Sequence, residues 1–238
     1  MQSMDQKKRL RELHCFRTLS DEAIEELSQA GKVSVYSKNT TIIRAREKVS
    51  EIYFAISGKV IIYNLTRHGQ RKIIFVLGPG VLINENVINS QYSSTFCDTI
   101  ERCELFSVES AVFLRLLEKD FSLTRVIMEE QERKIWRMSH QLKNTMGSIY
   151  MERKLAAKLW KLGRDFGTST EEGVRIEITM TITFLADLMG APRETISRLC
   201  KILTGYGLMK MERRRIILPD IDRLALFYKE GVLVNASK

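Results

Sequence analysis

The spacing of hydrophobic residues changes twice along the chain. Residues 4–30 have helical spacing, and Ser20 is suited to cap a short helix that contains Ile24 and Leu27. From about Lys32 to Val108, short runs of β-branched and aromatic residues alternate with polar ones, and glycines separate the runs. Strands that are this short and this regularly spaced predict an all-β roll.

A long helical stretch follows, from about residue 109 to residue 145, with a break expected near Lys119 and Asp120. Its apolar residues recur at spacings of three and four between charged flanks, a pattern typical of two helices that pack together. Packing of this helix on its own domain is the alternative, but such a helix normally has a wider apolar face. The seam therefore favours dimerisation. It consists of Met128, Gln131, Ile135, Met138, Leu142 and Thr145.

The last part of the chain returns to short elements. Residues 146–148 (Met-Gly-Ser) are expected to form a hinge, and a leucine-rich helix follows. A loop rich in Gly, Ser and Thr at 167–170 then leads to a strand at 174–178.

Two short helices are predicted next. Thr181 is suited to cap a helix at 182–189, and Gly190 is suited to end it. Pro192 fits the first turn of a second helix, at 193–203. Two short helices joined by a glycine turn predict a helix-turn-helix.

The second of these helices has the residues needed to read DNA bases. Arg193, Glu194, Ser197 and Arg198 fall on one side of it, opposite an apolar face. An arginine matches guanine O6 and N7 in the major groove, and a carboxylate accepts a hydrogen bond from cytosine N4. We therefore expect these four residues to face the groove together.

Residues 210–218 predict a two-stranded wing after the second helix. Arg213, Arg214 and Arg215 lie at its expected tip. On their own, three arginines in a row are more often a solvated charged turn. Beside a helix-turn-helix, contact with DNA phosphates becomes the favoured interpretation.

Composition is compatible with this interpretation but does not select it. The net charge of +9 attracts the chain to any polyanion. No apolar run approaches the length of a membrane span, and the first residues do not resemble a secretory signal. The four cysteines form no CxxC pair, so we expect a reducing, cytoplasmic location. They are Cys15, Cys97, Cys103 and Cys200.

Two stretches carry a resemblance to a known family. The segment from Gly190 to Arg198 looks like the recognition motif of the CRP/FNR family of transcription regulators. The segment from Tyr53 to Val60, continued through Gly69, Gly80 and Glu85, is similar to that family's cyclic-nucleotide-binding roll. The resemblance covers nearly the whole chain in the right order. It implies that Arg193, Glu194 and Arg198 read bases, as does Ser197 in FNR-like members.

The chain departs from the cyclic-AMP-binding members of that family at the phosphate pocket. Those members have a glycine–glutamate pair followed by an arginine that neutralises the phosphate. Here the pair is Asn84-Glu85, and Ser93 stands in the place of the arginine. Cyclic AMP is therefore not the expected effector, and Glu85 is more simply explained as a roll-stabilising carboxylate. If a small effector binds, we expect it near Glu85, Ser93, Ser94, Met138 and His140.

No cofactor is identified. An iron–sulfur cluster of the FNR type needs four thiolates, and only Cys15 lies in the N-terminal segment where that subfamily clusters its cysteines. A thiol switch at Cys15, Cys97 or Cys103 stays open, although buried cysteine is the commoner case.

The sequence thus predicts an α+β protein with a jelly-roll sensor at 1–108, a dimerisation helix at 109–145 and a winged helix-turn-helix at 146–238. We expect a homodimer that binds double-stranded DNA at palindromic promoter sites, and that contacts RNA polymerase if it is an activator. No enzymatic motif is present. The rival hypothesis is a ligand-sensing module that acts through protein partners without binding DNA.

Overall fold

The computed structural model describes residues 2–88, 92–143 and 150–231, and the chain divides into two compact units. The division follows residue 139, and residues 70–72 belong to the second unit. Thr145 of the expected seam and the expected hinge at 146–148 lie outside the described residues. Among the described residues, no helix is long and apolar enough to cross a bilayer.

The first unit begins with short helices, as their spacing predicts. They are α1 (Gln2–Glu12), a 3₁₀ turn (His14–Phe16) and α2 (Asp21–Ala30). Ser20 caps α2, because its hydroxyl accepts a hydrogen bond of 3.1 Å from the Ala23 amide.

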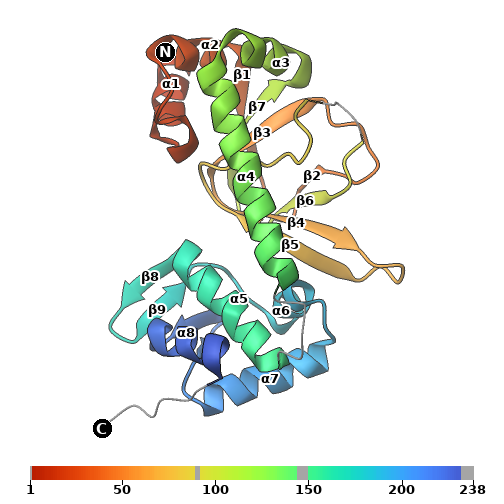
Figure 1. The fold of residues 1–238 in the computed structure, drawn as a ribbon, viewed down its shortest axis with the longest axis vertical. Helices are drawn as coiled ribbons and strands as arrows, with labels where there is room; N and C mark the ends of the chain where they lie inside the picture. The colour runs from red at the N-terminus through yellow and green to blue at the C-terminus, as the bar shows by residue number, and fades with distance from the viewer. Residues whose placement is uncertain (1, 89–91, 144–149, 232–238) are drawn as a thin grey trace. The chain divides into compact units, whose positions relative to one another are not determined.

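Two β-sheets form the roll, as expected. One has the strand order β1-β7-β3 and the other β2-β6-β4-β5 (Figure 1). The strands are β1 (Gly31–Tyr36), β2 (Thr41–Ile43), β3 (Glu51–Ser57), β4 (Val60–Leu65), β5 (Arg71–Leu77), β6 (Phe96–Thr99) and β7 (Cys103–Glu109).

Alternation along the strands builds two cores. Phe54 of β3 pairs with Phe106 of β7, and both side chains are buried in the cluster formed with the helices. The next pair, Ala55 and Leu105, belongs to a separate cluster with residues of the second sheet. Because successive side chains of a strand point to opposite faces, one pair of strands supplies both clusters.

The long helical stretch is split at the predicted place. Helix α3 (Ser110–Lys119) ends before Asp120, and α4 (Phe121–Lys143) begins directly after it. The Asp120 carboxylate accepts hydrogen bonds from the amides of Ser122 (2.7 Å) and Leu123 (3.3 Å). Asp120 therefore caps the first turn of α4, which explains the break.

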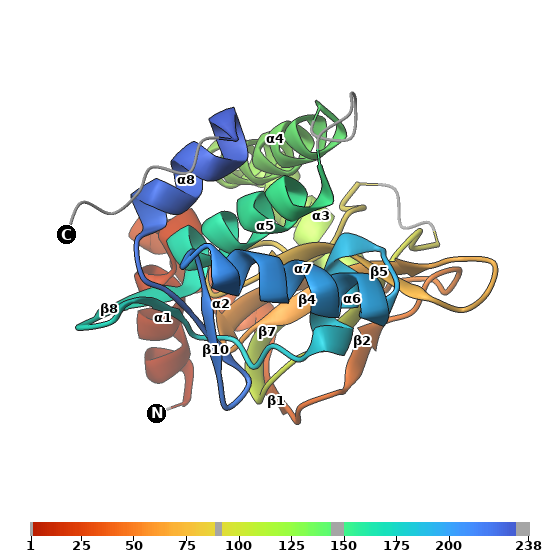
Figure 2. The same cartoon turned by 90° about the horizontal axis from the view of Figure 1, so that it is seen from below.

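The second unit contains the helix-turn-helix. Its elements are α5 (Met151–Phe166), β8 (Gly167–Thr170), β9 (Gly173–Ile176), α6 (Ile182–Met189), α7 (Arg193–Gly205), β10 (Lys210–Glu212), β11 (Arg215–Leu218) and α8 (Ile221–Glu230). Helices α6 and α7 are neighbours in both views (Figure 1 and Figure 2).

One sequence-based expectation for this unit was wrong: the segment 167–170, expected as a loop, is strand β8. The strand expected at 174–178 is present as β9, at Gly173–Ile176. The wing is not an isolated pair of strands, because the sheet order is β10-β11-β9-β8. β8 is an edge strand of polar, largely exposed residues, so it lacks the alternation that identifies a half-buried strand.

Candidate DNA-binding surface and roll pocket

The turn between α6 and α7 is held by the local interactions that the sequence predicts. The Thr181 hydroxyl caps α6 by accepting a 3.1 Å hydrogen bond from the Phe184 amide. Gly190 ends α6 in the left-handed conformation, with φ of 65°. Pro192 stands directly before α7, which starts at Arg193.

Helix α7 has one buried and one exposed face. Ile196, Leu199 and Leu203 are buried in the unit's core. Arg193, Glu194 and Arg198 are exposed, and Ser197 beside them is half-buried. The structure therefore brings the four expected base-reading residues together on the face that is free of the core.

Lys201, which was not among the residues predicted from the sequence, extends this exposed face by one turn. It is exposed and follows Arg198 by three residues and Ser197 by four. Residues at these spacings are neighbours on a helix surface. The same spacing rule, applied one turn further, would have found it.

The wing turns sharply at two of the three arginines. Glu212 of β10 pairs with Arg215 of β11, so Arg213 and Arg214 alone form the turn. Both have left-handed backbones, with φ of 44° and 67°, as the common two-residue hairpin turns require. Met180 donates a hydrogen bond of 2.8 Å from its amide to the Arg214 carbonyl, which ties the tip to the start of α6.

Arg215 is placed differently from the other two. It lies in β11, is half-buried and makes an ion pair with Glu177. Glu177 also accepts a 2.7 Å hydrogen bond from Arg175 Nε. The two guanidinium groups lower the pKa of Glu177, with the Arg175 hydrogen bond as the largest cause. This pairing is invisible in the sequence because 38 residues separate the partners.

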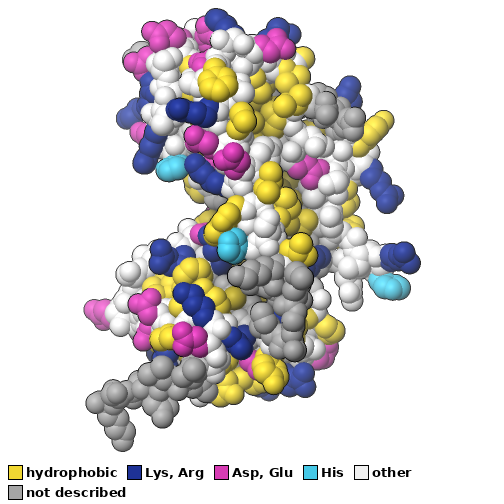
Figure 3. Space-filling model, viewed as in Figure 1, with side chains coloured by type: hydrophobic (Ala, Val, Ile, Leu, Met, Phe, Trp, Pro, Cys, Tyr) yellow, Lys and Arg dark blue, Asp and Glu magenta, His cyan; other side chains and the backbone are white. Residues whose placement is uncertain are grey.

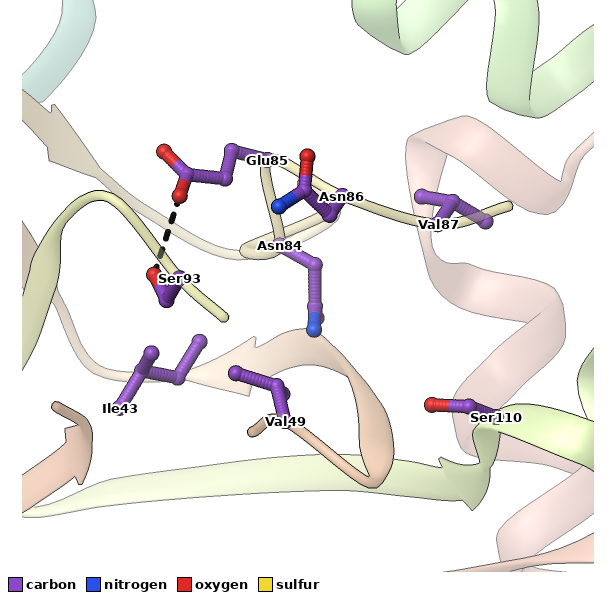
Figure 4. Close-up of a pocket in the computed structure, with 8 residues that line it drawn as sticks. All are labelled: Ile43, Val49, Asn84, Glu85, Asn86, Val87, Ser93 and Ser110. Atoms are coloured by element: carbon purple, nitrogen blue, oxygen red, sulfur yellow. Dashed lines mark hydrogen bonds between the residues drawn. The ribbon is translucent and has the colours of Figure 1, made fainter. Parts of the chain in front are cut away.

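In the roll, Glu85, Ser93 and Ser94 lie together. The Glu85 carboxylate accepts hydrogen bonds from the hydroxyls of Ser93 and Ser94, both at 3.0 Å, and from the Ser94 amide. The Thr95 hydroxyl donates a further bond of 3.1 Å. Figure 4 shows Glu85 directed toward Ser93. Glu85 thus stabilises the roll by joining two segments, as its simpler interpretation requires.

Asn84 has a structural role that the sequence did not reveal. It is 2% exposed, and its amide group makes the backbone hydrogen bonds to β3 that a neighbouring strand would make. Its oxygen accepts a 2.7 Å bond from the Tyr53 amide, and its nitrogen donates a 2.9 Å bond to the Glu51 carbonyl. Asn84 thus fastens its loop to the edge of β3.

The cavity beside these residues has a volume of about 10 Å³, which is room for about one water molecule. Met138 and His140 are exposed on α4 and do not line it. Its lining consists of Ile43, Val49, Asn84, Glu85, Asn86, Val87, Ser93 and Ser110 (Figure 4).

All four cysteines are buried. Burial raises the pKa of the Cys15, Cys97 and Cys103 thiols, and it raises that of Cys200 to about 11. A raised pKa disfavours the reactive thiolate. Within residues 2–88, 92–143 and 150–231, no three His, Cys, Asp or Glu side chains are grouped as metal ligands would be.

Four of the seam residues of α4 are accessible, whereas Gln131 is half-buried and donates a hydrogen bond to the Glu85 carbonyl. Met128, Ile135, Met138 and Leu142 have exposed fractions of 54%, 58%, 47% and 64%. In Figure 3, hydrophobic side chains follow the course that α4 takes in Figure 1.

A β-roll, a long helix and a winged helix-turn-helix with exposed basic residues on α7 form the architecture of CRP-type transcription regulators. Two family models match the chain: the cyclic nucleotide-binding domain at residues 33–120 and the Crp-like helix-turn-helix domain at residues 153–227. The chain belongs to the CRP/FNR family of transcription regulators. Members of this family regulate transcription and are not enzymes.

Relatives at low identity cover most of the chain. A CRP-like cAMP-activated global transcriptional regulator of Mycobacterium tuberculosis is 21% identical over 88% of this chain and 94% of its own length. The fumarate and nitrate reduction regulatory protein of Salmonella typhimurium is 23% identical over 87% of this chain and 83% of its own.

A solved structure has the same fold. It is that of the c-di-GMP responsive global regulator CLP of Xanthomonas campestris. Its TM-score is 0.73 at 18% identity, over 84% of this chain and 99% of that one.

Proposed function

We propose that this chain is a homodimeric regulator that binds palindromic promoter DNA through α7, with the roll as the part that receives the signal. The observation that carries the proposal is the exposed row of Arg193, Glu194 and Arg198 above the buried face of α7. Side chains of these types match the base edges of the major groove.

Contacts with the phosphates complete the interface. Arg213 and Arg214 at the wing tip approach the DNA backbone, and Arg215 acts from the strand, held by Glu177. Lys201 adds one more cation along α7. Contacts with the bases determine which DNA sequence is preferred, and contacts with the phosphates determine the affinity and the register of the protein on the duplex.

The dimer forms through the seam of α4. Two chains that share this seam bury Met128, Ile135, Met138 and Leu142, which a single chain exposes. Two-fold symmetry then places two reading helices about one turn of DNA apart, on a palindromic site. We accordingly divide the chain into three parts: a sensor at 1–108, a dimerisation helix at 109–145 and a DNA-binding domain at 146–238. RNA polymerase is a further partner if the protein activates its targets.

Cyclic AMP is not the effector of this chain. Ser93 stands where a phosphate-neutralising arginine is needed, and the cavity holds about one water molecule. A small effector, where one acts, binds near Glu85, Ser93 and Ser94, and Met138 and His140 on α4 are the other candidates.

The test is a salt titration of binding to DNA sites selected from a random library, with scrambled DNA as the control. A specific complex should exceed non-specific binding by a factor of about 10³ or more and weaken steeply with salt. Equal affinity for selected and scrambled DNA would instead favour the rival function, a sensing module that acts through protein partners.

A further inference from the structure

The segment Ser93–Thr95 presents several hydrogen-bond donors to one point in space. Three hydroxyls and one backbone N–H are directed at the Glu85 carboxylate, and each of its oxygens takes part in two of these bonds. The Ser93 hydroxyl has one proton, for which Glu85 and the Thr95 carbonyl at 2.8 Å compete. Even so, three other donors are directed at the carboxylate.

Such an arrangement is what a bound anion requires. Charge-assisted hydrogen bonds from hydroxyls and backbone amides bind carboxylates and phosphates in proteins. In this chain the anion is covalently part of the protein. Glu85 lies in the loop that follows β5, and its carboxylate ties that loop to the segment before β6.

The same loop is also bound to α4. The Gln131 side-chain amide donates a 3.2 Å bond to the Glu85 carbonyl. The Lys134 ammonium donates bonds of 2.6 Å to the Asn84 carbonyl and 3.3 Å to the Ile83 carbonyl. The Leu82 amide adds a bond of 3.4 Å to the Glu130 carboxylate. A change at the Glu85 carboxylate therefore acts on a loop that four hydrogen bonds connect to the helix of the seam.

We propose that Ser93–Thr95 form an anion site whose occupant is the Glu85 carboxylate, an internal ligand that closes the roll without a cyclic nucleotide. A carboxylate-bearing effector enters only by displacing Glu85. The proposal rests on the proposed function for the statement that the roll receives the signal. The site itself is defined by the donors.

The test uses the full-length chain and three forms of residue 85. Glu85→Ala removes the anion and leaves its space, so the melting temperature should fall by roughly 3–8 °C. Sodium acetate, at ionic strength matched with sodium chloride, should restore much of that loss by binding the vacated site. Glu85→Gln is the matched control, because it fills the same space and places an NH₂ group among donors. It should be destabilised and should not respond to acetate.

Wild-type protein should respond to neither acetate nor cyclic AMP. The proposal is overturned if Glu85→Ala has the same melting temperature as the wild type. It is also overturned if acetate changes the melting temperatures of all three proteins equally. It is also overturned if inorganic phosphate rescues Glu85→Ala and acetate does not, since the site would then be a phosphate site.

If Glu85→Ala does not fold, a double-mutant cycle between Glu85→Gln and Thr95→Val answers the same question. The two losses should be less than additive, because both remove one interaction, and strict additivity would contradict the proposal. All these readouts are melting temperatures without DNA. A failure here leaves the DNA-binding proposal standing, and a failure to bind DNA leaves the acetate result unchanged.

Discussion

The ammonium of Lys134 lies 2.6 Å from the carbonyl oxygen of Asn84, and it is the shortest of the bonds that join α4 to this loop. Lys134 is only 8% exposed. Burial lowers its pKa to about 8, although the charges of Glu130 and Glu85 oppose this and Arg137 adds to it. The bond is therefore made by a cation that the protein interior disfavours.

This lysine should make stability depend on pH in the alkaline range. An unfolded lysine keeps its proton up to a pKa of about 10.5, whereas the folded Lys134 releases it near 8. Between these values the unfolded state binds more protons, so unfolding becomes less favourable as pH rises. Below pH 8 the full cost of the buried charge is present.

The measurement is urea unfolding of wild type and Lys134→Met from pH 7 to pH 10. The unfolding free energy of the wild type, relative to that of Lys134→Met, should increase by up to about 3 kcal/mol over this range. Other titrating groups are shared by both proteins and cancel. A difference that is constant with pH would mean that Lys134 keeps an ordinary pKa.

Arg198→Ala and Arg214→Ala should affect DNA binding in different ways. A bidentate arginine contributes roughly 1–3 kcal/mol of discrimination at one base pair, so Arg198→Ala should relax preference at one position per half-site. Arg214→Ala should weaken binding to all sequences about equally and reduce the salt slope by about one unit per subunit.

A panel of single-base variants of the selected site separates the two effects. If Arg198→Ala lowers affinity uniformly and Arg214→Ala changes base preference, the roles are reversed. If neither changes DNA binding, α7 is not the reading helix. Glu194, by the same reasoning, should contact a cytosine, and Ser197 a phosphate or an adjacent base.

Ile135→Lys should dissociate the dimer. The substitution places a charge in the seam, where it has no partner and loses water on association. Light scattering at micromolar concentration should give twice the chain mass of 27.5 kDa for wild type and a smaller mass for the variant. Leu142→Lys should act similarly. Glu129→Lys, which adds a lysine to the same helix away from the seam, should remain dimeric, and a monomeric wild type would refute the seam.

Calorimetry with cyclic AMP should show no sub-micromolar binding to the wild type. Ser93 supplies no positive charge, and the carboxylate of Glu85 occupies the donors that would otherwise face a phosphate. Tight binding of cyclic AMP would contradict this expectation, because it would show that the nucleotide readily displaces the Glu85 carboxylate from its hydrogen-bond donors.

Local chemistry made much of the fold predictable. The break at Asp120, the caps at Ser20 and Thr181 and the end of α6 at Gly190 depend on residues a few positions apart, and all are confirmed. The two-helix motif and the exposed face of α7 followed from the spacing of its apolar residues.

The interactions that were not predicted join distant parts of the chain. Glu177 with Arg215 and Asn84 with Tyr53 are side-chain bonds across 38 and 31 residues, and no periodicity records them. Strand β8 was missed for a related reason, because its polar residues acquire their structure by pairing with β9. Sequence patterns report burial well and long-range polar partners poorly.

In the proposed DNA complex, the left-handed backbones of Arg213 and Arg214 have a consequence for the tightness of association. Non-glycine residues in this conformation cost about 1 kcal/mol or more each, and folding of the four-stranded sheet supplies that energy before any DNA is present. The turn therefore has its hairpin conformation before any contact with DNA. The entropy that a disordered basic loop loses on docking, about 1–2 kcal/mol for each residue, is here lost during folding instead.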